Sequence, residues 1–101
     1  MNEEEYKKSI ATIAEHYGYE SQSRQLIEEM AELTVAINKW WRCDGDLRQR
    51  AEKRANIVEE IADVKIMLDQ MIYFICGKAE VEKIVNAKIE RQLNRMESEG
   101  K

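Results

Sequence analysis

Apolar residues along most of the chain recur at steps of three and four positions, the spacing that places side chains on one face of an α-helix. This pattern breaks at short polar or glycine-containing segments, which divide the chain into four helical stretches. We expect helices from about Asn2 to Gly18, from Ser21 to about Arg42, from Asp46 to Gly77, and from about Ala79 to Glu97.

Polar residues at the expected helix ends fit this division. Asn2 and Asp46 each stand three residues before a Glu or Gln, the spacing of a capping box, and Ser21 is the N-cap candidate of the second helix. Gly18 and Gly77 suit the position that follows the last turn of a helix.

The apolar stripes of the helices define the expected core. They comprise Tyr6, Ile10, Ile13 and Tyr17; Leu26, Met30, Leu33, Ile37 and Trp40; Ile57, Ile61, Val64, Leu68, Met71 and Ile75; and Val81, Val85, Ile89, Leu93 and Met96. Helices joined by short turns pack antiparallel, so residues 1–101 are expected to form one all-α domain, a four-helix antiparallel bundle. Four amphipathic helices of this length enclose a thin core, and apolar residues remain beyond each stripe. We therefore expect oligomerisation, as a homodimer or a homotetramer, to complete the fold.

Composition further limits the fold class and the partners that the protein can have. The chain has no proline and four glycines, and 36% of its residues are charged, which disfavours a β-sheet protein. A net charge of −4 argues against binding of a nucleic-acid polymer. No apolar run approaches the roughly 20 residues needed to span a bilayer, and the acidic start lacks a signal-peptide pattern. Cys43 and Cys76 are unclustered, so we expect reduced thiols and a cytoplasmic protein without a membrane partner.

Two heptapeptides with the same chemical pattern carry the candidate chemistry: IEEMAEL at residues 27–33 and VEEIADV at residues 58–64. In each, one carboxylate lies at the edge of the apolar stripe and a second lies one turn further along the same side. Antiparallel packing by the stripes can bring the four carboxylates together, and this set is Glu29, Glu32, Glu60 and Asp63. Such a cluster must either take up protons or hold a cation, and oxygen ligands of this kind suit Mg²⁺ or Mn²⁺.

The acidic residues also allow other interpretations. A pair of carboxylates three residues apart is usually a solvated helix face. A di-iron site of the ferritin type needs Glu-x-x-His pairs, whereas His16 lies in another helix, so we discount iron. Asp44 to Asp46 lack the spaced ligands of a calcium loop and are expected to form a turn and a cap.

The segments EEMAE and EIAD resemble the EExxE…ExxD signature of the MazG-like all-α nucleoside triphosphate pyrophosphohydrolases. The segment NAKIERQL is similar to the C-terminal Asn-x-Lys-Phe-x-x-Arg pattern of that family, at Asn86, Lys88 and Arg91. Ile89 replaces the usual Phe, and Gln92 stands where many members carry a second Arg. The resemblance covers about residues 25–95.

The resemblance implies hydrolysis of a nucleoside triphosphate to the monophosphate and pyrophosphate, with removal of non-standard nucleotides as the housekeeping role that the family suggests. It implies a Mg²⁺ site, with Mn²⁺ as an alternative, at Glu29, Glu32, Glu60 and Asp63. It implies Glu28 as a candidate general base, Lys88 and Arg91 as phosphate ligands, and Asn86 as a substrate contact. Trp41 cannot face the core together with Trp40, so it is a candidate for stacking on the base or for a subunit contact.

Two alternatives stay open. A helical interaction module without catalytic chemistry would show the same apolar periodicity. A phosphoribosyl-ATP pyrophosphohydrolase shares the helical fold, although the double-Glu motif fits it less well.

Overall fold

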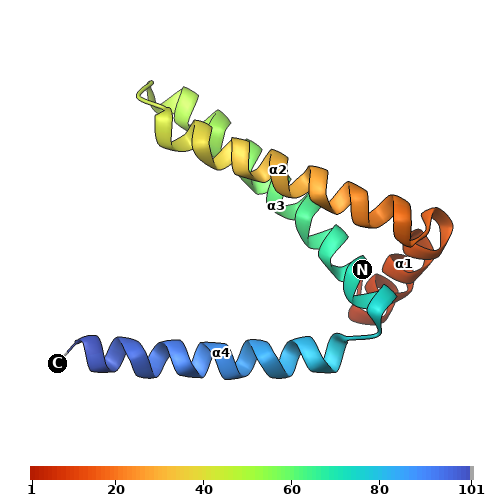
Figure 1. Cartoon of the computed structure of the whole chain (residues 1–101). Helices are drawn as coiled ribbons and strands as arrows, with labels where there is room; N and C mark the ends of the chain where they lie inside the picture. Colours follow the sequence, from red (N-terminus) through yellow and green to blue (C-terminus); the bar gives the residue numbers. More distant parts are fainter. Residues whose placement is uncertain (101) are drawn as a thin grey trace.

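The computed structural model describes residues 1–100 and contains four α-helices (Figure 1). These are α1 (Glu3–Tyr17), α2 (Tyr19–Arg42), α3 (Leu47–Ile75) and α4 (Lys78–Glu99). The described residues include no β-strand, which confirms the all-α class and the number of helices. Among residues 1–100, none of the helices combines the length and the apolar character that a membrane span requires.

Local capping signals set two of the helix starts as expected. The Asn2 side chain accepts a hydrogen bond of 2.8 Å from the Glu5 backbone N–H. Asp46 and Gln49 form a complete capping box, in which each side chain accepts from the other residue's backbone N–H at 3.0 Å. These contacts involve residues three apart in sequence, so short patterns are sufficient to predict them.

Two other boundaries differ from the prediction. Helix α2 begins at Tyr19, so Ser21 lies inside its first turn and is not the N-cap. The cause is Gly18, whose φ of 88° lets the chain reverse within one residue between α1 and α2. At the end of α3 the left-handed conformation is taken by Cys76, with φ 53°, rather than by Gly77.

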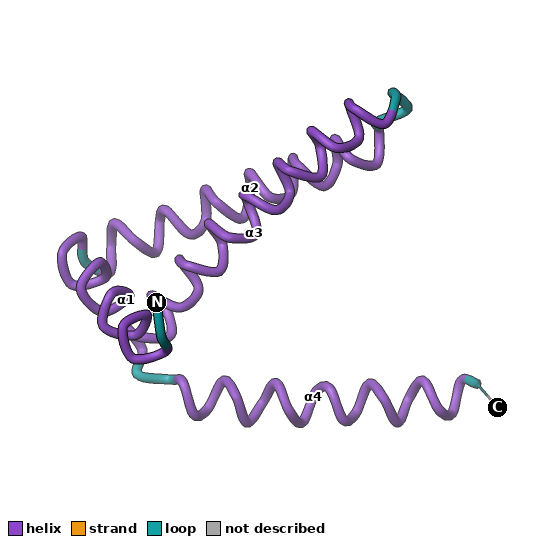
Figure 2. Tube along the Cα trace, turned by 180° about the vertical axis from the view of Figure 1, so that it is seen from behind, coloured by secondary structure: helices purple, strands orange, loops and turns teal. Residues whose placement is uncertain are grey.

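Helices α2 and α3 form a long antiparallel hairpin that provides most of the tertiary packing (Figures 1 and 2). Leu26, Val64 and Met67 form the buried core cluster, and Leu33 and Met71 pack against it. A buried amide pair adds a polar contact, in which Gln22 Nε2 donates to Gln70 Oε1 at 2.7 Å.

The seam between α2 and α3 follows the predicted apolar stripes only in part: Leu26, Leu33, Val64 and Met71 lie in it as expected, and other stripe residues do not. On α2, Ala36 is only 1% exposed, whereas Met30 and Ile37 are about two-fifths exposed. Ile61, Leu68 and Ile75 of α3 are likewise exposed, so their predicted core positions are wrong. Ala36 and the Gln22–Gln70 amide pair therefore share the seam with the apolar core cluster, and several larger apolar side chains lie on its flank.

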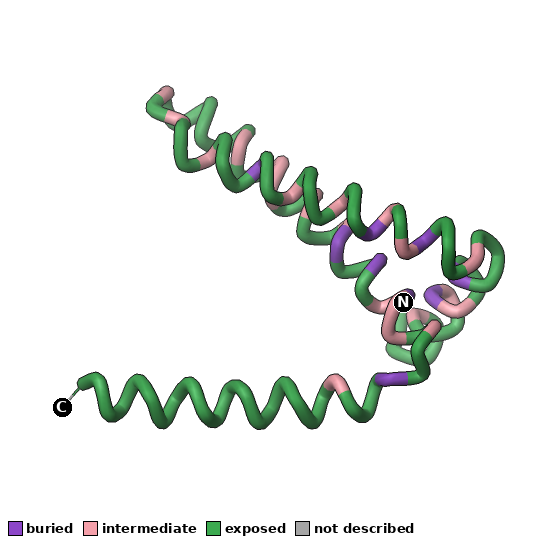
Figure 3. The backbone as a smooth tube through the Cα atoms, in the orientation of Figure 1, coloured by how far each residue is buried: buried purple, intermediate pink, exposed green. Residues whose placement is uncertain are grey.

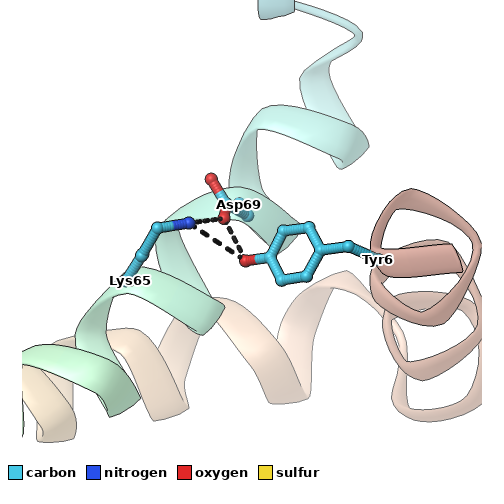
Figure 4. A network of polar contacts seen from close by, with 3 residues as sticks. All are labelled: Tyr6, Lys65 and Asp69. Carbon is cyan, nitrogen blue, oxygen red and sulfur yellow. Dashed lines mark hydrogen bonds and ion pairs between the residues drawn. The ribbon is translucent and has the colours of Figure 1, made fainter. Parts of the chain in front are cut away.

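Helix α1 packs across the end of this hairpin where α2 begins and α3 ends (Figure 1). Ile10 is buried there, and Tyr6 donates a hydrogen bond to Asp69 of α3, which also accepts one of 2.9 Å from Lys65 (Figure 4). Burial and the hydrogen bond to Asp69 raise the pKa of Tyr6. The phenol therefore remains a protonated donor, and this network anchors α1 to α3.

Helix α4 leaves the rest of the molecule after the turn at residues 76–77 (Figure 1). It contacts α3 beside that turn, and none of its residues is buried (Figure 3). Val81 is half-buried, but Val85, Ile89, Leu93 and Met96 are 45–58% exposed, so their predicted inward position is wrong for the single chain. One chain by itself therefore does not close a four-helix bundle.

Candidate metal centre on helices α2 and α3

Three carboxylates from two helices meet on the α2–α3 hairpin. Glu29 comes from α2, and Glu60 and Asp63 come from α3. One oxygen of each lies within 4.8 Å of the corresponding oxygens of the other two. All three side chains are half-buried. We call this group the acidic cluster.

The register of the hairpin explains why these residues meet. Gln22 stands seven residues before Glu29, and Gln70 stands seven residues after Asp63. Because the helices are antiparallel, the register that pairs Gln22 with Gln70 also brings Glu29 opposite Asp63. The four-residue connection between α2 and α3, closed by the Asp46 capping box, holds the same register from the other end.

The cluster contains buried oxygen atoms that lack a hydrogen-bond partner. Oε2 of Glu29 and Oε2 of Glu60 are both buried, and neither has a hydrogen-bond partner among residues 1–100. Oε1 of Glu29, in contrast, accepts a hydrogen bond of 2.8 Å from Gln25 Nε2. A buried carboxylate oxygen without a donor carries a desolvation penalty that the protein itself does not offset here.

Concentrated negative charge also affects the pKa of Glu60. Burial raises the pKa of this carboxyl, and repulsion from Glu32, Asp63, Glu29 and Glu59 raises it further. A cation among these oxygens would offset both effects. Without one, the repulsion favours the protonated form of Glu60 over its charged form.

The donor set fits a hard divalent ion. Carboxylate oxygens are preferred ligands of Mg²⁺ and Mn²⁺, and Mg²⁺ usually keeps several waters while taking few protein ligands. Buried oxygens without donors are the atoms that such an ion would use. Glu32 is exposed and lies outside the group of three, but its charge acts on Glu60.

The other predicted site residues do not join the cluster in one chain. Glu28 is exposed beside Glu29, on the neighbouring part of the helix surface. Trp41 is 79% exposed and stands twelve residues beyond Glu29, roughly 18 Å along the helix axis at 1.5 Å per residue. Asn86, Lys88 and Arg91 are exposed on α4, which extends away from the α2–α3 hairpin (Figures 1 and 3).

Sequence reasoning missed the glutamines around the cluster. Gln25 lies four residues before Glu29, a spacing at which side chains on a helix meet. The sequence could therefore have predicted this contact. The Gln22–Gln70 pair joins residues 48 apart, and only the tertiary register reveals it.

The chain was compared with models of protein families, with curated proteins and with solved structures, and none of the three comparisons gives a match. The residues and their geometry are therefore the basis of the functional proposal.

Proposed function

We propose that this protein is a metal-dependent nucleoside triphosphate pyrophosphohydrolase of the MazG-like type. The reaction joins water to the α-phosphate of a (d)NTP and releases (d)NMP and pyrophosphate. The observation that carries the proposal is the acidic cluster, with its two buried, unpartnered carboxylate oxygens on opposite helices. The resemblance of EEMAE and EIAD to the family signature supports the same residues.

In this proposal Glu29, Glu60 and Asp63 hold Mg²⁺ or Mn²⁺, and Glu32 completes the set from the exposed edge. The bound ion supplies a Lewis acid that polarises phosphoryl oxygens and offsets charge on the leaving pyrophosphate. Glu28 is free to face solvent next to the ligands, so its carboxylate can take a proton from the attacking water. Lys88 and Arg91 bind phosphate oxygens, and Asn86 and Trp41 contact the nucleoside.

The proposal requires a second copy of the chain, because the cationic residues of α4 lie away from the carboxylates of the same chain. Exposed apolar side chains recur at seven-residue steps on α2 (Met30, Ile37) and on α3 (Ile61, Leu68, Ile75). Met30 and Ile61 directly follow the cluster carboxylates Glu29 and Glu60, and successive residues on a helix point about 100° apart. A partner that covers these stripes can therefore lie beside the carboxylates and leave them open to substrate. We propose a homodimer, or a dimer of dimers, in which a bundle forms between copies and Lys88 and Arg91 reach the substrate from α4 of the second copy.

A nucleotide panel tests the reaction. Purified protein is incubated with each (d)NTP and with phosphoribosyl-ATP, with Mg²⁺ or with EDTA, and monophosphate, diphosphate, pyrophosphate and phosphate are resolved. We expect monophosphate and pyrophosphate in the presence of metal alone. Release of single phosphate, or turnover that persists in EDTA, contradicts the proposal. Turnover of phosphoribosyl-ATP in preference to every (d)NTP would assign the alternative enzyme class.

A second candidate function is a non-catalytic interaction module, and the exposed apolar stripe of α4 favours it. Under this hypothesis the stripe binds a partner helix and divalent ions leave the protein unchanged. A thermal-shift titration with Mg²⁺ separates the two, because an ion that binds the folded state raises the unfolding temperature in a concentration-dependent manner.

A further inference from the structure

Among the side chains of residues 1–100, Gln25 alone donates a hydrogen bond to a carboxylate of the acidic cluster. Its Nε2 lies 2.8 Å from Oε1 of Glu29, and both residues are partly buried. We propose that Gln25 is a positioning residue of the metal site, which fixes the Glu29 carboxylate so that Oε2 serves as the metal ligand. This inference rests on the metal site of the proposed function and assigns a residue that the motif does not include.

The two carboxylate oxygens of Glu29 differ in their hydrogen bonding, and this difference supports the role of Gln25. Oε1 has a partner in Gln25, whereas Oε2 is buried and has none, as is also true of Oε2 of Glu60. A carboxylate can rotate about its last torsion and exchange its oxygens. The bond from Gln25 removes that freedom for Glu29 and leaves one defined oxygen for a cation.

Glutamine suits this position better than a cationic donor. A Lys or Arg one turn before Glu29 could donate the same hydrogen bond, but its positive charge would neutralise the cluster and repel a divalent ion. The amide of Gln25 orients the carboxylate and adds no charge. Partners that hydrogen-bond to metal ligands typically account for 10- to 100-fold in metal affinity.

A purely structural role makes a different prediction. If Gln25 only satisfied a polar group of the folded protein, its loss would lower stability without metal and leave the affinity for metal unchanged. Gln25 is half-buried on a helix, and Ala has the highest helix propensity, so Gln25→Ala is expected to fold.

The test is a Mn²⁺ titration of the full chain, followed by electron paramagnetic resonance of the free ion, for wild type, Gln25→Ala and Gln25→Met. Met keeps the length of the side chain and lacks the donor. Thr34→Ala is the matched control, because Thr34 is a neutral, exposed residue of α2 whose hydroxyl bonds to the Met30 backbone carbonyl. Unfolding temperatures in EDTA are recorded for all four proteins.

We expect both Gln25 variants to raise the Kd for Mn²⁺ about 10- to 100-fold, while Thr34→Ala binds as wild type does and the unfolding temperatures in EDTA stay close together. Wild-type affinity in both Gln25 variants overturns the role of Gln25 and leaves the metal site standing. Lower unfolding temperatures in EDTA with unchanged Kd assign Gln25 a structural role instead. A wild-type protein that binds no Mn²⁺ overturns the metal site of the proposed function, and the role of Gln25 with it.

Discussion

Helix α4 and the α2–α3 hairpin are both amphipathic, but only the hairpin buries part of its apolar surface within one chain. The hairpin buries Leu26, Val64 and Met67 and brings three carboxylates together at the same seam. Helix α4 carries an equally regular apolar stripe and buries none of it. Periodicity therefore predicts that a helix has an apolar face, and the antiparallel partner determines whether that face is buried in the same chain.

The difference also separates two kinds of functional residue. The acidic cluster is complete within one chain, because the register of a single hairpin aligns it. The cationic residues Lys88 and Arg91 are exposed on α4, which contacts α3 only beside the turn between the two helices. If the proposed function is correct, the anionic half of the site is intrinsic to the monomer and the cationic half depends on assembly.

The largest expected effect is on turnover, and it comes from removing a carboxylate of the acidic cluster on the α2–α3 hairpin. Asp63→Ala should lower pyrophosphate release by about a hundredfold or more, equivalent to about 2.7 kcal/mol of transition-state stabilisation. It removes a proposed ligand while leaving the helix intact. Glu52→Ala is the control, since Glu52 lies on the same helix in an exposed pair with Arg48. Steady-state assays with Mg²⁺ measure both, and circular dichroism checks helicity. Full activity of Asp63→Ala would remove it from the site.

The next effect concerns α4. Ile89→Asp combined with Leu93→Asp should convert the proposed oligomer to a monomer of 11.9 kDa at micromolar concentration, because burying an unpaired carboxylate costs several kcal/mol. Loss of assembly should also lower turnover. The affinity for Mn²⁺ depends on α2 and α3 and should change little. Light scattering and Mn²⁺ titration report the two properties. Glu90→Gln, an exposed polar change on the same helix, is the control. A wild-type protein that is already monomeric would contradict the assembly.

The buried amide pair gives a smaller effect on stability. Gln70→Leu should lower the free energy of unfolding by about 1–3 kcal/mol, because it leaves the Gln22 amide buried without its partner. The double variant Gln22→Leu/Gln70→Leu should recover most of that loss, since replacing both partners with apolar groups removes the unpaired amide. Urea denaturation of the single and double variants measures the coupling. Equal loss in the single and double variants would show that the pair itself is not the source.

These contrasts show which parts of the molecule the sequence could predict. The caps at Asn2 and Asp46 and the meeting of Glu29 with Glu60 and Asp63 depend on short patterns and one antiparallel register, and both can be inferred from spacing. The burial of Ala36 in place of Ile37 depends on how closely two helices approach, which spacing does not specify.

The direction of α4 was also beyond sequence reasoning. It is set at residues 76–77, where Cys76 adopts φ 53°, a conformation that Cys rarely takes and that the preceding pattern does not signal. Gly77 predicts the end of α3, but it does not predict the direction of α4 relative to α3. The position of Lys88 and Arg91 relative to the carboxylates was therefore the least predictable part of the candidate site.

The smallest effect is the pH dependence of the stability of the metal-free protein. It tests whether repulsion among the carboxylates at the seam destabilises the fold. The pKa of Glu60 is raised in the folded state by burial and by its acidic neighbours, above its ordinary value of 4.5. The stabilisation linked to this proton is therefore fully present below pH 4.5 and is lost as the pH rises through the higher folded-state value.

It follows that Glu60→Gln, which stays neutral, should be more stable than wild type in EDTA at neutral pH, and that the difference should vanish in acid. Glu52→Gln, in its exposed pair, should show no such pH-dependent difference. Urea unfolding between pH 4 and pH 7.5 measures these differences. Saturating Mg²⁺ should reverse the order at neutral pH, because the ion stabilises only the protein that retains the Glu60 carboxylate as a ligand. A Glu60→Gln variant that is less stable than wild type in EDTA would mean that the carboxylates at the seam are stabilised by the protein alone, and the argument for a cation from their buried oxygens would fail.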